Sequence, residues 1–438
     1  MDLGLNSGIP NVLHIDLNSC FASIEQQANP FLRGKPIAVG AYTTPNGCIL
    51  AASVEAKRLG IKTGMRVRDG KALYPNLIVL SPDAEKYREV HRSSRNIMVD
   101  YTDNFSSKSI DEFVLHFEKV PVLRRGRPTL SSLRRQGSTQ INIDSVSEHG
   151  MTSEKQAMVQ IGKEIKDRIK SEVGDWLTVS IGIGPNRFYA KTAAGLHKPD
   201  GLDVMDFQNA REVYKKLKLT DLHGINIRNQ IRLNSVRVYT PLQFLDASLP
   251  QLRAAFHSIN AFYFYTRLRG WEIDSVDFSR KSFGNQYALG KPLMPVREME
   301  PILAKLVNKT GSRLRRAGYK AKGIHIALRY KDGSYWHRGK TVERALYDTS
   351  DIYKEILNIL AEAPKKPVGL ISESCFNLVS DNLTQTELFC DVLKKENLAR
   401  AMDKVNRRWG AFVLTTGRMA GTADKVPDRI AFGAVSEL

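Results

Sequence analysis

The chain contains the sequence NVLHIDLNSCFASIE at residues 11–25. Its first half, Asn11 to Leu17, is apolar and rich in β-branched residues, which predicts a buried strand with Asp16 near its end. A helix is expected to begin directly after this strand. A lone Asp at a strand end more often caps a turn than binds a metal, so Asp16 becomes a site candidate only if other acidic residues join it.

Strands and helices alternate through the rest of the first 200 residues. The expected elements are a strand at 77–80, a helix from 84 to 98, a strand at 108–117, a helix from Ser153 to 173 and a strand at 177–183. The helix from Ser153 opens with an S-x-x-Q capping box and stops at Gly174. This order predicts a mixed α/β domain in which two strands carry acidic residues.

Three carboxylates, Asp16, Asp111 and Glu112, are the candidate catalytic residues. Nucleotidyl transfer depends on two magnesium ions about 3.5 to 4 Å apart, held by carboxylates from neighbouring strands, which position the reacting groups and neutralise phosphate charge. Adjacent residues of a strand point to opposite faces, so Asp111 and Glu112 can share a site only if the strand twists or bulges there.

Basic residues are concentrated in one stretch of the second half. Lys and Arg number 65 against 46 Asp and Glu, and residues 305–340 hold eleven of these cations against one acid, Asp332. Alternating apolar residues from Ile324 to Tyr330, followed by Asp332-Gly333, predict a β-hairpin. Such a surface would bind nucleic-acid phosphates without reading sequence, although a solvated face is the alternative. The candidate DNA contacts are Lys320, Lys322, Arg329, Lys331, Arg338 and Lys340.

Length and composition indicate a protein of three or four domains in a reducing compartment. The chain has 438 residues, and its four cysteines lack the CxxC spacing of a metal knuckle. It shows no export signal and no stretch near 18 uncharged apolar residues. We therefore expect a cytoplasmic, nucleoid-associated protein that does not enter membranes.

Several motifs, taken together, resemble the Y-family of translesion DNA polymerases, in its bacterial branch. The resemblance rests on four stretches in the family's order: residues 14–25, Ala51 to Gly64, Ser109 to Glu112, and Ser180 to Gly201. It implies an α/β (α+β) multidomain fold of right-hand polymerase form with a mixed-sheet palm. The implied domains are palm at 1–20 and 80–205, fingers at 21–79, helical thumb at 206–271, little finger at 282–380 and tail at 381–438.

The resemblance also implies roles for individual residues. Asp16, Asp111 and Glu112, with the Leu17 carbonyl, would bind two Mg²⁺ ions. Phe21 would be the aromatic gate that excludes ribonucleotides, with a packed core aromatic as the alternative. Lys198, in His197-Lys198-Pro199-Asp200-Gly201, would contact the incoming triphosphate.

Two motifs depart from the family pattern. Val54-Glu55-Ala56-Lys57 replaces Y-E-A-R, so Lys57 would keep a charge without the planar fork of Arg, or Arg58 would substitute for it. In the thumb, His223-Gly224-Ile225-Asn226 replaces P-G-I-G.

The tail contains a possible partner motif. Gln385, Leu388 and Phe389 fit the Q-x-x-L-F pattern by which bacterial polymerases dock on the sliding clamp. Residues 401–410 resemble a short tail helix, to which we assign no mechanism. The basic loop from Arg124 to Arg135 has no assigned role beyond a possible DNA contact.

The expected function is that of a low-fidelity, template-directed DNA polymerase that extends a primer past damaged bases. Its partners would be primer–template DNA, dNTP and the sliding clamp, and the protein would be a monomer. The alternatives are a catalytically weak, clamp-bound accessory protein, suggested by Val54, Lys57, Asn18 and Ser19, and a nucleotidyl cyclase with the same palm chemistry.

Overall fold

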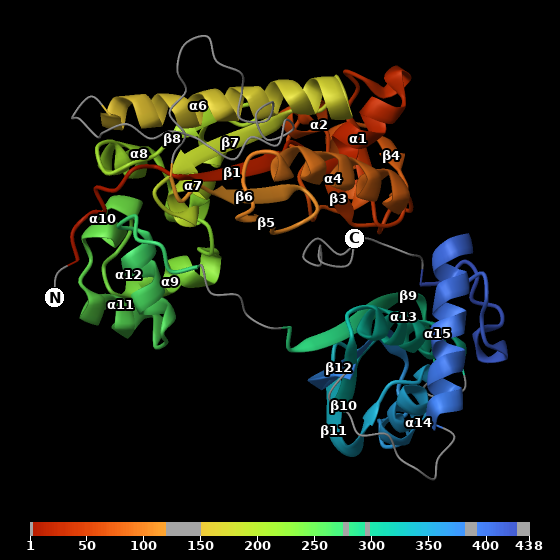
Figure 1. Cartoon of the computed structure of the whole chain (residues 1–438). Helices are drawn as coiled ribbons and strands as arrows, with labels where there is room; N and C mark the ends of the chain where they lie inside the picture. The colour runs from red at the N-terminus through yellow and green to blue at the C-terminus, as the bar shows by residue number, and fades with distance from the viewer. Residues whose placement is uncertain (1–2, 120–149, 275–279, 294–297, 382–391, 427–438) are drawn as a thin grey trace. The chain divides into compact units, whose positions relative to one another are not determined.

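The computed structural model describes residues 3–119, 150–274, 280–293, 298–381 and 392–426. Two compact units form, Met1–Asp277 and Phe278–Asp428. Each is described by itself (Figure 1). Among the described helices, none combines the length and the apolar character that a membrane crossing needs.

A five-stranded sheet is the centre of the first unit, with strand order β5-β6-β1-β7-β8. The central strand β1 (Val12–Leu17) is antiparallel to both β6 (Glu112–His116) and β7 (Val179–Gly184). The edges are β5 (Phe105–Ser107) and β8 (Leu202–Val204), of which β8 is parallel to β7. One sequence expectation is refined here: β6 begins at Glu112, so Asp111 lies just before the strand rather than within it.

The two faces of this sheet are covered differently because side chains alternate along β1. Leu13, Ile15 and Leu17 enter a large apolar core. Three helices complete that core: α1 (Cys20–Ala28), α4 (Ala84–Val99) and α6 (Gly150–Arg168). A π-helical turn at Ile169–Val173 continues α6 as far as its C-cap residue, Gly174. The long helix α6 is prominent in Figure 1. It starts at Gly150, so the expected start at a Ser153 capping box is wrong.

Helix α7 (Arg187–Leu196) packs on the opposite face, against β1 and β7. The Asn186 side chain caps this helix by accepting a hydrogen bond from the Tyr189 N–H at 2.7 Å. Gly182 allows the close approach, because a Cβ at this position would lie 1.9 Å from the Ala190 carbonyl oxygen. The glycines of the Ser180-Ile181-Gly182-Ile183-Gly184 motif therefore let α7 lie directly on the sheet.

A smaller three-stranded sheet, ordered β3-β2-β4, occupies the segment expected to be the fingers. It contains β2 (Ile37–Gly40), β3 (Ile49–Ala52) and β4 (Ile78–Leu80), with helices α2 (Val54–Arg58) and α3 (Val67–Leu73) and a 3-10 turn at Pro30–Leu32. Ser53 caps α2 by accepting from the Ala56 N–H at 3.2 Å. This cap fixes the start of the helix that carries Lys57.

Short helices complete the first unit, as expected for residues 206–271. They are α8 (Ala210–Lys216), a 3-10 turn at Leu219–Asp221, α9 (Ile227–Ser235), α10 (Pro241–Asp246), α11 (Leu249–Phe256) and α12 (Asn260–Arg267). Their shared core includes Phe244, Phe256 and Phe264, whose rings pack against one another.

The second unit is a four-stranded antiparallel sheet covered by helices, with strand order β11-β10-β12-β9. Its strands are β9 (Ser282–Leu293), β10 (Tyr319–Tyr330), β11 (Tyr335–Leu346) and β12 (Val368–Ser380). Helices α13 (Glu300–Arg316) and α14 (Thr349–Leu360) share its core. The expected hairpin is confirmed: β10 and β11 pair across a turn in which Gly333 has φ +83°.

Helix α15 (Val392–Trp409) follows this sheet, with a 3-10 turn at Gly417–Met419 beyond it. It contains most of the tail helix expected at 401–410. The Arg124 to Arg135 loop and the clamp-motif residues Gln385, Leu388 and Phe389 lie outside the described residues.

Candidate active site

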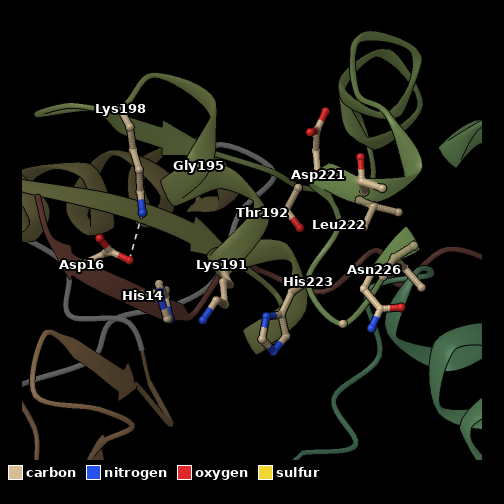
Figure 2. Close-up of a pocket in the computed structure, with 13 residues that line it drawn as sticks. His14, Asp16, Lys191, Thr192, Gly195, Lys198, Asp221, Leu222, His223 and Asn226 are labelled. Atoms are coloured by element: carbon tan, nitrogen blue, oxygen red, sulfur yellow. Dashed lines mark ion pairs between the residues drawn. The ribbon is translucent and has the colours of Figure 1, made fainter. Parts of the chain in front are cut away.

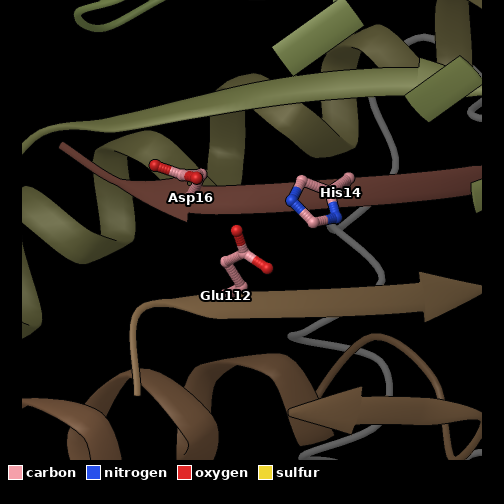
Figure 3. Close-up of side chains that lie close together, drawn as sticks. All are labelled: His14, Asp16 and Glu112. Carbon is pink, nitrogen blue, oxygen red and sulfur yellow. The ribbon is translucent and has the colours of Figure 1, made fainter. Parts of the chain in front are cut away.

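The three candidate carboxylates meet at one end of β1. Asp16 and Glu112 are direct partners in the antiparallel β1–β6 ladder, so their side chains lie on the same face of the sheet (Figure 3). Asp111 precedes β6, and its carbonyl accepts a 2.9 Å hydrogen bond from the Leu17 N–H. Because Asp111 is not yet in the pleated strand, it escapes the alternation that would point it away from Glu112. No bulge is needed.

Burial and neighbouring charges act in opposite directions on these carboxyl groups. Burial raises the pKa of Asp16, which Lys198 partly offsets. Burial also raises the pKa of Asp111, although the Ser109 hydroxyl donates a hydrogen bond to it. Burial alone would raise the pKa of Glu112, but Lys191 outweighs it and the pKa is lowered. Carboxylates crowded in a poorly solvated place favour a bound cation.

Two lysines supply positive charge to this group. The Lys198 ammonium lies 2.9 Å from an Asp16 oxygen, and the Lys191 ammonium lies 2.7 and 2.8 Å from the two Glu112 oxygens. Lys191 projects from α7, whereas Lys198 follows it in the loop before β8. These ammonium groups stand where divalent cations would neutralise the same carboxylates.

Asn18 connects the end of β1 to the loop that carries Lys198. Its amide donates to the Ser180 hydroxyl at 2.9 Å, and its carbonyl oxygen accepts from the Asp200 N–H at 2.7 Å. Asn18 is 5% exposed, so these bonds form in the interior. The residue therefore fixes the loop, and with it Lys198, relative to the carboxylates.

His14 joins Asp16 and Glu112 on this face of the sheet, two positions before Asp16 on β1. One of its ring nitrogens and carboxylate oxygens of Asp16 and Glu112 all lie within 4.8 Å of one another. Burial lowers the pKa of His14 to about 3, so its ring is neutral at pH 7. A nitrogen donor and two carboxylates form a set that fits a divalent cation.

A cavity of about 430 Å³ opens beside the carboxylates, and Figure 2 shows its lining. One wall comes from β1, α7 and the loop after α7, and includes Asp16, Lys191 and Lys198. The other comes from residues 220–226, which include His223 and Asn226 at the altered P-G-I-G motif. The cavity thus has a mixed lining of acidic and basic groups, as a site for cation-bound phosphates requires.

The remaining nucleotide-pocket candidates take different positions. Lys57 is brought near the site: partial burial and then Lys198 lower its pKa, while Asp16 and Asp111 act in the opposite sense. Arg58 is exposed at the end of α2. Phe21 is 2% exposed and stacks on Tyr87 with ring centroids 4.3 Å apart. It does not line the cavity, so its gate role remains a prediction.

The candidate DNA contacts of the second unit fall into two groups, exposed and buried. Lys322, Arg329, Lys331, Arg338 and Lys340 are exposed on β10, β11 and their turn. Arg338 pairs with Glu362, and Lys340 lies 3.0 Å from Glu355.

Lys320 is a correction. It is only 7% exposed, and its ammonium lies 2.7 Å from Glu396 and 3.2 Å from Asp381. It therefore holds the unit together rather than facing DNA. The sequence could not reveal this, because the acidic partners come from the tail.

Sequence reasoning missed His14, Lys191 and His223 as site residues. His14 could have been found, because a polar residue two positions from Asp16 on a buried strand must share its face. Lys191 lies on α7, and the position of this helix on the sheet depends on the close approach that Gly182 allows. His223 reaches the cavity only through folding of the 206–271 segment, which its local sequence does not disclose.

Comparisons with known proteins agree with this geometry. Residues 15–195 match the model of the impB/mucB/samB family, and residues 280–388 match that family's C-terminal domain. "DNA polymerase IV" of Moorella thermoacetica is 30% identical over 92% of this chain and 94% of its own length. "DNA polymerase IV" of Pelotomaculum thermopropionicum is 29% identical over 91% and 92%.

Solved structures show the same fold. A Y-family DNA polymerase chimera of Dbh and Dpo4 matches with a TM-score of 0.68 at 21% identity, covering 84% of this chain and 99% of that chain. An insertion ternary complex of Dbh DNA polymerase matches with a TM-score of 0.54 over the same shares. The expected multidomain α/β fold is confirmed.

Proposed function

Because the chain belongs to the impB/mucB/samB family of Y-family DNA polymerases, we propose that its group of carboxylates catalyses nucleotidyl transfer to a primer terminus. The chain is a DNA-directed DNA polymerase of the translesion type, whose substrates are DNA and nucleotide. Membership of this family favours the enzyme over the accessory protein. The observation that carries the proposal is the direct pairing of Asp16 with Glu112, beside Asp111.

Divalent-cation dependence follows from the family, and the residues fit it. We assign Asp16, Asp111 and Glu112, with the Leu17 carbonyl, to two Mg²⁺ ions. When bound, such ions lower the pKa of the attacking 3′-hydroxyl and neutralise charge on the triphosphate. The fit rests on the charge of the site: two of its half-buried acids already attract ammonium groups at 2.7 to 2.9 Å.

The lysines would exchange partners as the substrate binds. Lys198 and Lys191 pair with carboxylates in the cation-free protein, and both line the cavity. Divalent cations at the carboxylates would release the ammonium groups toward triphosphate oxygens. Lys57, which lies near Lys198, would add a third positive charge, and Arg58 a fourth from the next helical position.

Primer extension tests the catalytic proposal. The intact chain should extend a primer with Mg²⁺ and dNTPs, whereas Asp111→Ala should lose at least about 10³-fold in rate. Asp167→Ala, which changes an exposed acid on α6, is the matched control and should retain full activity. Absence of extension by the intact chain would instead favour the accessory role, and normal extension by Asp111→Ala would exclude the assigned carboxylate.

We also assign Phe21 as the gate against ribonucleotides. It stands on α1 directly after Cys20, whose pKa is raised first by burial and then by Asp111 and Asp16, so this turn of α1 lies near the carboxylates. Phe21→Ala should raise the ratio of ribonucleotide to deoxyribonucleotide incorporation. Phe117→Ala, which empties the same apolar core, controls for lost packing. Equal ratios in the two variants would remove the gate assignment.

Template binding is assigned to exposed cations of the second unit. Lys322, Arg329, Lys331, Arg338 and Lys340 all belong to one hairpin, as a backbone-binding surface requires. Replacing Arg329 by Gln should lower the slope of log affinity against log salt by about 1, independently of DNA sequence. A sequence-dependent loss would contradict this.

Gln385, Leu388 and Phe389 are assigned to docking on the sliding clamp, by sequence pattern alone. Changing Leu388 and Phe389 to Ala should abolish stimulation by the clamp and leave unassisted synthesis unchanged; equal loss of both would count against the motif. We further propose a monomer that works at the nucleoid, where its DNA substrate lies. Sedimentation of the full chain tests the first point.

A further inference from the structure

We propose that His14 is a nitrogen ligand for a divalent transition-metal cation held together with Asp16 and Glu112. This inference deepens the proposed function, on which it rests for the place of the cation. It adds a donor of a different chemical class to the carboxylates assigned above, and it concerns which cations the site accepts.

The surroundings of His14 give the first argument. The residue is 2% exposed on the central strand, and its neighbours across the ladders are Val114 and Gly182. Its Nε2 atom is buried and has no hydrogen-bond partner in the part of the chain that the structure describes. A buried nitrogen without a partner costs about 1 to 3 kcal/mol, so an apolar side chain would suit this position better unless something binds the nitrogen.

The geometry of the three side chains gives the second argument. His14 and Asp16 project from the same face of β1, and Glu112 projects toward them from β6 (Figure 3). A ring nitrogen and two carboxylate oxygens, all within 4.8 Å of one another, can be reached by one cation after small side-chain rotations. Short strands of one sheet carry all three, so the group is held by rigid backbone.

The donor types then indicate the cation. Mg²⁺ prefers oxygen ligands in a near-ideal octahedron, whereas imidazole suits first-row transition metals. With one nitrogen and two carboxylates, the site should gain more affinity for Mn²⁺ than for Mg²⁺. Lys191 must withdraw from Glu112 when the cation enters, and the adjoining cavity, which Lys191 lines, gives its side chain room.

Pulsed electron paramagnetic resonance on the full chain with Mn²⁺ alone tests the inference. Directly coordinated imidazole should produce a ¹⁴N coupling in the spectrum of bound Mn²⁺. His14→Phe fills the same space without a nitrogen donor and should abolish that coupling. It should also weaken Mn²⁺ binding about tenfold, and Mg²⁺ binding, measured by competition, by less than about threefold.

His223→Phe is the matched control, because His223 lines the same cavity outside the three-residue group. It should retain the ¹⁴N coupling and Mn²⁺ affinity. Absence of ¹⁴N coupling in the unmodified chain with Mn²⁺ bound overturns the inference without any variant. Coupling that disappears in His223→Phe and persists in His14→Phe would transfer the role to His223 and also overturn it.

Primer extension by the same preparation separates this inference from the proposed function. A chain that extends primers with Mg²⁺ but shows no ¹⁴N coupling would refute the role of His14 alone. A chain with ¹⁴N coupling that does not extend primers would refute the catalytic proposal alone. His14→Gln, which preserves polarity, is a second variant to use if His14→Phe does not fold.

Discussion

Two sets of ion pairs in this molecule have similar distances and opposite surroundings. In the active-site pairs, Lys198–Asp16 and Lys191–Glu112, the atoms lie 2.9 and 2.7 Å apart, and the lysine side chains are 42% and 28% exposed. In the tail-helix pairs, Lys320–Glu396 and Arg315–Asp403, they lie 2.7 and 2.6 Å apart, and the cations are 9% and 5% exposed. Burial, rather than distance, distinguishes pairs that can exchange partners from pairs that hold structure.

The tail-helix pairs explain how α15 stays on the second unit. The helix buries little apolar surface there, with Ala399 at 5% exposure as its one buried hydrophobic residue in the described part. It adds Lys395, 2.8 Å from Asp351, and Arg400, which donates to the Tyr347 hydroxyl at 2.8 Å. Ion pairs and hydrogen bonds therefore hold α15 on this unit. Two cations of the basic stretch, Arg315 and Lys320, are paired with α15 and do not face solvent.

Breaking a tail-helix pair should have the largest effect. Lys320→Met leaves Glu396 and Asp381 without their buried cation, which should cost the second unit about 3 to 4 kcal/mol of unfolding free energy. Calorimetry of the full chain, following the transition of this unit, measures the loss. Glu396→Leu combined with Lys320→Met should recover part of it, because the double variant leaves fewer unpaired charges.

An effect below about 1 kcal/mol for Lys320→Met would mean that α15 is held by other contacts. It would also return Lys320 to the candidates for DNA contact. The claim that the buried tail-helix pairs stabilise the second unit would then be wrong.

Breaking an active-site pair should cost activity instead of stability. Lys198→Met should lower kcat/KM for dNTP about 10²-fold, close to 3 kcal/mol of transition-state stabilisation, because a charge-assisted phosphate contact is lost. The free energy of unfolding should change by less than about 1 kcal/mol, since the Lys198 side chain is 42% exposed. Steady-state kinetics and thermal unfolding of one preparation measure both. Equal losses in the two would show that this pair is structural as well.

The contrast also shows how far sequence reasoning can go. Strand order in the first 200 residues predicted the mixed sheet, whereas alternation from Ile324 to Tyr330 predicted the hairpin and the charge count of residues 305–340 predicted the basic surface. Asp111 could not be placed from alternation alone, because a one-residue difference in where β6 begins changes which face a side chain takes. Lys320 was misassigned because its partners Glu396 and Asp381 are up to 76 residues away. Local charge counts cannot anticipate such long-range pairing.

Glu373 is a buried acid that differs from both sets of pairs. Among the described residues, no cation lies within ion-pair distance of its carboxyl group. It lies on β12, 2% exposed, with hydrogen bonds from Thr310 and Asn285 and Arg313 farther away. Burial raises the pKa of Glu373 to about 8 from the ordinary 4.5. Between these values the folded chain keeps a proton that the unfolded chain releases, so stability should fall as pH rises from about 4.5 through 8.

Glu373→Gln should remove this pH dependence. It should stabilise the second unit increasingly as the pH rises from about 4.5 to 8, with no further gain above that range, and change little near pH 4.5. Melting of the unit at several pH values measures the slope. Glu362→Gln, at an exposed acid of the same unit, should leave the slope intact. An unchanged slope in Glu373→Gln would show that the carboxyl is ionised in the folded chain.

The smallest effect is expected at an exposed pair with good geometry. Arg211 and Asp246 join α8 to α10 through two hydrogen bonds of 2.8 and 2.9 Å, and both side chains are 50% exposed. Arg211→Met should lower the free energy of unfolding by less than about 0.5 kcal/mol, and this loss should disappear in high salt, because water solvates either partner alone.

Arg315→Met is the matched change, since Arg315 also contacts its partner Asp403 through two hydrogen bonds, of 2.6 and 2.9 Å, but is buried. A loss of several kcal/mol at Arg315 beside almost none at Arg211 would point to burial as the cause, because both arginines contact their carboxylate through two hydrogen bonds. Similar losses would assign the stabilisation to that geometry, and the active-site lysines would then be harder to release than their exposure indicates.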